Sequence, residues 1–282
     1  MTRRMMIGIG AIAAMVALGA AEITRGGPHT VRQPEFAACV QLSTHAEQTR
    51  CLAPYVHDAV RSGSTRPMLR ALETLVRDGS IDDCHRLAHD IGHAAFEFHG
   101  RLSTALHEGG PACLNGYYHG ATEAAVRHAA ADGAPPITEL CTELREAGPA
   151  YNGCVHGLGH GLMHLYGNVT DARRECGRLT EDYARGRCVD GVYMENSMRL
   201  LDLDQTAYRA AAPRACEGLA LPSDDLALCA GQIGEIAMFY YRHDLPSALA
   251  VCRAISEGPT VAACEQGARD ELATVALERR LR

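Results

Sequence analysis

The chain has 282 residues, of which 27 are basic and 34 acidic, so its formal net charge is −7. Binding to nucleic acid needs a concentrated basic face, and neither the charge nor the distribution of the arginines provides one, so we expect no nucleic-acid partner. Tryptophan is absent and only 5% of the residues are aromatic. The abundance of alanine and leucine favours helices packed through small side chains over a β-sandwich.

The amino-terminal segment has the composition of an export signal. Arg3 and Arg4 precede an uncharged run over residues 5–21, which ends in small residues. The run is long for a cleaved signal and barely long enough to span a bilayer, so residues 1–24 are predicted to be a signal peptide or a retained membrane anchor. Both alternatives place the rest of the chain outside the cytoplasm, as a periplasmic, secreted or membrane-anchored protein.

The rest of the chain divides into two parts. Residues 25–34 are rich in glycine, proline and arginine without apolar periodicity, which predicts a linker. Residues 35–282 are predicted to form one helical domain. Within it, an even and high number of cysteines in an exported chain indicates disulfides.

The twelve cysteines fall into six successive pairs. Five of the pairs enclose 11 or 12 residues, and in the second half of the chain the pairs recur every 35 to 40 residues, a period typical of stacked helical hairpins. Turn residues such as Gly148-Pro149 and Gly258-Pro259 lie inside the pairs. We therefore predict an all-α, solenoid-like stack of about six α-hairpins, each with a disulfide near its turn, although spacing alone does not fix the connectivity. The pairs are Cys39 and Cys51, Cys84 and Cys113, Cys141 and Cys154, Cys176 and Cys188, Cys216 and Cys229, and Cys252 and Cys264.

The second cysteine of each pair begins a common phrase. In four copies a glycine follows three residues later, where it would permit a neighbouring backbone to approach closely. Three residues further on, five of the six copies carry a histidine or a carboxylate, which is unusual beside a packed face. The glycines are Gly116, Gly157, Gly191 and Gly267, and the later positions are His57, His119, His160, Met194, Glu235 and Asp270.

Two segments carry histidines at a four-residue step. CHRLAHDIGH contains His85, His89 and His93, and CVHGLGHGLMH contains His156, His160 and His164. Residues four apart share one face of a helix, and two such histidines can present ligands to one ion. Neighbouring helices pack 8–10 Å apart, so a third ligand can come from the next helix.

These patterns predict a transition-metal site whose ion is Zn, Fe, Cu, Mn or Ni, since the spacing does not choose among them. Glu123 in GYYHGATE and Glu195 in GVYMEN are candidates for a ligand, a catalytic base or a group that orients a ligand. The metal-ligand candidates are His85, His89, His119, His156 and His160.

Three resemblances accompany these motifs. The run His89-Asp90-Ile91-Gly92-His93 resembles the HDIG signature of HD-domain phosphohydrolases, which implies a metal-binding His-Asp pair, but it covers five residues and lacks the lysine that usually follows the glycine. The phrases CHRLAHDIGH, GYYHGATE, CVHGLGHGLMH and GVYMEN resemble an uncharacterised group of exported bacterial and archaeal helical proteins, which implies a shared site without a known activity. In form the chain is similar to disulfide-stapled Sel1-type repeats, although its cysteines are more widely spaced.

Three functions remain open from the sequence. The first is an extracytoplasmic metal-binding helical-repeat protein. The second is a protein-interaction scaffold or cell-envelope adaptor, because repeat arrays often bind a peptide or a polymer. The third is a metal-dependent hydrolase or oxidase that uses Glu123 or Glu195 as a base. The sequence does not decide whether the chain is an enzyme, nor its oligomeric state.

Overall fold

The computed structural model describes residues 33–81, 83–133, 136–256 and 258–281, and their regular structure is entirely helical. This confirms the all-α class. The α-helices are α1 (Gln33–Val40), α2 (His45–Arg61), α3 (Thr65–Arg77), α4 (His85–His99), α5 (Leu102–Glu108), α6 (Gly116–Asp132), α7 (Pro149–Tyr166), α8 (Val169–Cys176), α9 (Asp182–Met198), α10 (Gln205–Ala211), α11 (Ser223–Tyr240), α12 (Leu245–Arg253) and α13 (Gly258–Leu281). Short 3-10 helices are η1 (Ile137–Glu139), η2 (Thr142–Leu144) and η3 (Ala212–Arg214).

The predicted signal or anchor, residues 1–24, lies outside the described residues, as does most of the predicted linker. The first helix begins at Gln33, within the range 25–34 assigned to that linker. No helix in the described part of the chain combines the length and the apolar character that a bilayer crossing requires.

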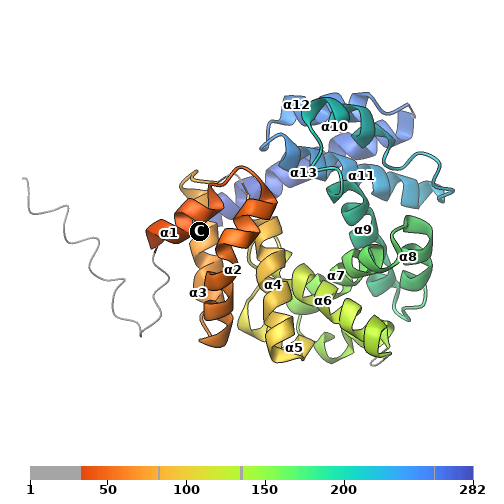
Figure 1. Ribbon diagram of the computed structural model, residues 1–282. Coiled ribbons are helices and arrows are strands. Elements are labelled where there is room, and N and C mark those ends of the chain that lie inside the picture. The colour runs from red at the N-terminus through yellow and green to blue at the C-terminus, as the bar shows by residue number, and fades with distance from the viewer. Residues whose placement is uncertain (1–32, 82, 134–135, 257, 282) are drawn as a thin grey trace, which may run out of the picture.

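The longer helices pack against one another in chain order. Helix α2 contacts α4, and contacts then continue from α4 to α6, α7, α9, α11 and α13. In Figure 1 these helices follow a curve, with shorter helices such as α8 and α12 on its outside. The later part of the curve comes back to α4, because Arg86 on α4 pairs with Asp202 after α9 at 3.1 Å and the ring centroid of His85 lies 5.9 Å from that of Phe239 on α11. The stacking of six equivalent hairpins stays a prediction.

Six disulfides link the twelve cysteines in consecutive pairs, which are the six pairs recognised in the sequence, so that none of the twelve is free. Such a set of cross-links indicates an oxidising, extracellular environment. Two of the linked segments differ from a simple α-hairpin. The bridge from Cys84 to Cys113 encloses both α4 and α5, and Cys141 lies between η1 and η2, so that 3-10 turns stand where the first helix of the hairpin was expected.

Glycines hold the neighbouring long helices close together. A Cβ atom on Gly120 of α6 would lie 2.0 Å from the carbonyl oxygen of His89 on α4, and one on Gly191 of α9 would lie 2.1 Å from that of His156 on α7. Real Cβ atoms cannot come so close, so only glycine permits these contacts. Because His119 precedes Gly120, the close contact of α4 and α6 also brings His119 near His89, with ring centroids 5.4 Å apart.

Candidate metal centre

Five buried histidines from three successive helices form one cluster. Each ring lies near at least two others, with centroid separations from 4.7 to 5.4 Å. Two overlapping triads, which share His119, have ligand atoms within 4.8 Å of one another. The structure thus brings together all five predicted ligand candidates: His85 and His89 on α4, His119 on α6, and His156 and His160 on α7.

Two of these imidazoles are oriented by glutamates from the next helix. The Nδ1 atom of His89 lies 2.8 Å from Oε1 of Glu123 on α6, and Nδ1 of His160 lies 3.0 Å from Oε2 of Glu195 on α9. Both glutamates are buried. A histidine that ligates a metal almost always donates its other N–H to a carboxylate or a carbonyl, so these glutamates occupy the position expected of orienting groups.

The rings of His85 and His156 also have an oxygen atom close to Nδ1. The Nδ1 atom of His85 donates to the carbonyl oxygen of Cys113 at 3.0 Å, and Nδ1 of His156 lies 3.3 Å from Oδ2 of Asp190. The turn that presents the Cys113 carbonyl is unusual, because Cys113, Leu114 and Asn115 have φ angles of 52°, 55° and 65°. Left-handed backbone at three successive non-glycine residues is costly and is typical of functional sites.

Some of the remaining ring nitrogens face one another inside the cluster, whereas Nε2 of His156 lies 3.5 Å from Sδ of Met194 on α9. Nε2 of His85 lies 3.0 Å from Nε2 of His89. Nε2 of His160 and Nδ1 of His119 are buried without a hydrogen-bond partner among the described residues. Buried polar atoms are almost always paired, so several unpaired lone pairs directed at one place call for a cation.

Burial favours the neutral form of three of the five imidazoles. Burial, together with the neighbouring histidines, lowers the pKa of His85 and of His119 well below the ordinary value. Burial also lowers the pKa of His156 to about 4, against the opposing effect of Asp190. For Glu123, burial acts to raise the pKa, but the facing His89 and His93 outweigh it and lower the pKa. Neutral imidazoles beside an ionised carboxylate are the forms that bind a metal.

The structure adds three residues that were absent from the predicted set. Asp190 lies beside His156. His93 and His164 are the last histidines of the two four-residue series on α4 and α7, which we call the histidine rows, and they form the outer end of these rows. Nε2 of His93 lies 2.6 Å from Oε2 of Glu123. The four-residue step already marks His93 and His164 as members of the rows. Nothing in the sequence around Asp190 indicates its role, which depends on how α9 packs against α7.

Other residues singled out in the sequence lie away from the cluster. Asp90 of the HDIG-like run accepts a hydrogen bond from Thr49 Oγ1 at 2.6 Å and lies 3.4 Å from His45 Nε2, so its carboxylate faces α2. His57 is exposed on α2, and Asp270 is exposed on α13, where it accepts from Gln266. An aspartate adjacent to His89 in sequence therefore does not share its site.

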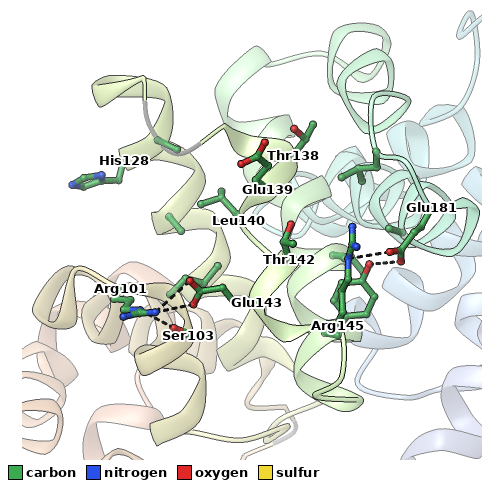
Figure 2. A pocket seen from close by; sticks show the side chains of 18 of the residues that line it. Arg101, Ser103, His128, Thr138, Glu139, Leu140, Thr142, Glu143, Arg145 and Glu181 are labelled. Atoms are coloured by element: carbon green, nitrogen blue, oxygen red, sulfur yellow. Dashed lines mark hydrogen bonds and ion pairs between the residues drawn. The ribbon is translucent and has the colours of Figure 1, made fainter.

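A separate, solvent-open cavity of about 740 Å³ lies near the start of α5 and α7 (Figure 2). Four of its charged side chains form two pairs: Arg101 with Glu143 and Arg145 with Glu181, each at 3.0 Å. The clustered histidines are not among the described residues that line it.

Comparisons with known proteins add no relative: no family model, no curated protein and no solved structure matches the chain. The chemistry must therefore follow from the cluster itself. Its buried His and Glu groups could hold a metal ion. Neutral imidazoles suit Zn, Fe, Cu and Ni, whereas Mn prefers oxygen ligands.

Proposed function

We propose that this protein binds a transition-metal ion outside the cytoplasm through its buried histidine cluster. The observation that carries the proposal is the 3.0 Å separation of the Nε2 atoms of His85 and His89. Nδ1 of His85 donates to the Cys113 carbonyl, and Nδ1 of His89 lies 2.8 Å from Oε1 of Glu123. Two ligands of one tetrahedral ion stand ~3.3 Å apart when each metal–nitrogen bond is about 2.0 Å, so the two Nε2 atoms are already close to the spacing of a ligand pair.

The composition of the cluster narrows the choice of ion. Its five candidate ligands are all imidazoles, which favours Zn, Cu, Fe or Ni over Mn. Thiolate ligation is not available, because all twelve cysteines are in disulfides. The same disulfides, with the signal-like residues 1–24, support a location outside the cytoplasm. We further propose that the disulfide-linked segments form a solenoid-like array, supported by the consecutive contacts from α2 to α13.

The test is the metal content of the purified protein and of one matched pair of variants. His119 belongs to both ligand triads, so we expect His119→Ala to lower the affinity of the buried cluster for its ion by about 100-fold or more and to reduce the metal content of the purified protein. His128→Ala removes an exposed histidine from the same helix and should retain the metal content of the wild type. Elemental analysis of the three proteins, each checked for helicity by circular dichroism, measures the difference. Equal metal content in wild type and His119→Ala would contradict the proposal.

Metal-dependent catalysis is the second candidate function, and the exposure of His164 at the outer end of the histidine rows favours it. His164 is 44% exposed and its Nε2 atom lies 3.5 Å from Oε1 of Glu195. A catalytic metal needs a coordination position that substrate or water can reach. The buried imidazole cluster offers none, so a catalytic role would require an ion at the exposed end.

A further inference from the structure

We propose that a second divalent cation binds at the outer end of the histidine rows, held by His93, Glu123, His164 and Glu195. This inference rests on the proposed function, because the same glutamates that orient the buried imidazoles would hold the second ion. The four residues come from α4, α6, α7 and α9, so four successive helices would supply one ligand each.

Glu123 is positioned to serve both sites at once. Its Oε1 atom lies 2.8 Å from Nδ1 of His89, which belongs to the buried cluster. Its Oε2 atom lies 2.6 Å from Nε2 of His93 and 3.9 Å from Nε2 of His164. Oε1 of Glu123 therefore faces the buried cluster, and Oε2 faces His93 and His164.

Glu195 divides its oxygens in the same way. Oε2 lies 3.0 Å from Nδ1 of His160 in the buried cluster, and Oε1 lies 3.5 Å from Nε2 of His164. Ligand atoms from Glu123, His164 and Glu195 all lie within 4.8 Å of one another. Bonds of about 2.0–2.2 Å to nitrogen and oxygen place the ligands of one ion up to ~4.3 Å apart, so small side-chain adjustments complete the site.

The charge and exposure of this group also suit a cation. The side chains of Glu123 and Glu195 are only 2% and 7% exposed, so two carboxylates converge in a region from which most water is excluded. Burial of like charges is unfavourable unless a counter-charge is present. The histidine side chains are more open, at 25% for His93 and 44% for His164, which gives an ion a route from solvent and leaves room for a water ligand.

The two sites would differ in their preference for metals. The buried cluster offers imidazole alone, whereas the outer group offers two imidazoles and two carboxylates. A mixed nitrogen and oxygen set accepts Mn and Fe as well as Zn, and carboxylate ligands in particular suit Mn. We therefore expect Mn(II) to bind at the outer site and not in the buried cluster.

The first experiment counts zinc ions per chain. Chelator-treated full-length protein is dialysed against dilute Zn(II) and analysed for metal and protein. We expect two ions in the wild type and in His128→Ala, and one ion in His164→Ala. Because His164 is partly exposed in the last turn of α7, its loss should leave the fold intact, which circular dichroism checks.

The second experiment measures Mn(II) affinity from the electron paramagnetic resonance signal of the free ion. His164→Ala should bind Mn(II) at least about tenfold more weakly than the wild type. One zinc ion in both wild type and His164→Ala, with unchanged Mn(II) affinity, would overturn the second site and leave the buried site standing. Absence of any bound zinc from the wild type would overturn both proposals.

Discussion

Replacement of Gly120 by alanine is expected to lower the free energy of unfolding by about 3 kcal/mol or more and to abolish metal retention. The added Cβ would lie 2.0 Å from the carbonyl oxygen of His89 and 2.6 Å from its Cα. Both atoms belong to backbone, so α4 and α6 would have to separate. Separation would also move His119 and Glu123 away from His89. Urea denaturation of the metal-free protein and elemental analysis of the purified protein measure the two effects.

Gly186 provides the control for this substitution. It lies inside α9, is exposed, and a Cβ there would meet nothing within 4 Å. Gly186→Ala should therefore raise the free energy of unfolding by about 0.5–1 kcal/mol, through the higher helix propensity of alanine. If Gly120→Ala proved equally stabilising, the close packing of α4 on α6 would be refuted.

The second large effect concerns Glu235 on α11. Burial, followed by the nearby carboxylates of Glu271 and Asp190, raises the pKa of Glu235 to about 8 from an ordinary value of 4.5. A carboxyl whose folded pKa is raised contributes fully to stability below pH 4.5 and loses that contribution as the pH rises towards 8. Glu235→Gln should therefore gain stability relative to wild type across this window, by about 3 kcal/mol at pH 8, since partial exposure reduces the full effect.

The measurement is the free energy of unfolding of both proteins between pH 4 and pH 9, in the presence of chelator so that metal binding does not contribute. Titration of the buried histidines affects both proteins equally and cancels in the difference. Asp270→Asn, which removes an exposed carboxylate from α13, is the matched control, and its effect should stay within about 0.5 kcal/mol. A difference between Glu235→Gln and wild type that does not change with pH would rule out a buried, protonated Glu235.

The features that the sequence predicts well are those carried by local periodicity. His85 and His89 are four residues apart, so they share one face of the helix whatever other helices it packs against. The glycine three residues after a cysteine, as at Gly116 or Gly191, likewise marks a helix face that meets another backbone. The class of fold and the metal-ligand candidates follow from such patterns, because each needs only the geometry of a single helix.

The features that the sequence misses depend on contacts between helices. Asp190 becomes a partner of His156 because α9 packs on α7, which no local pattern reveals. The HDIG-like run implied that His89 and Asp90 bind metal as a pair, whereas the structure directs the two side chains to different helices. Adjacent residues on a helix diverge by about 100°, and this rotation directs Asp90 towards α2 while His89 faces α6.

The turn at Cys113–Asn115 was also beyond prediction. Asparagine tolerates the left-handed conformation of Asn115, but the same conformation at Cys113 and Leu114 runs against their local preferences. The disulfide between Cys84 and Cys113 and the packing of α6 against α4 impose that backbone. Because tertiary contacts impose the backbone conformation of Cys113 and Leu114, the sequence of the turn does not predict it.

The bridge between Cys84 and Cys113 has a consequence for how the protein matures. Cys84 immediately precedes His85, and the Cys113 carbonyl is the acceptor for the Nδ1 atom of that same imidazole. Both ends of the cystine thus fix a single ligand candidate, and a newly made chain with reduced thiols would lack this restraint. Under the proposed function, oxidation of the thiols would precede metal binding, which would then follow arrival in the compartment where disulfides form.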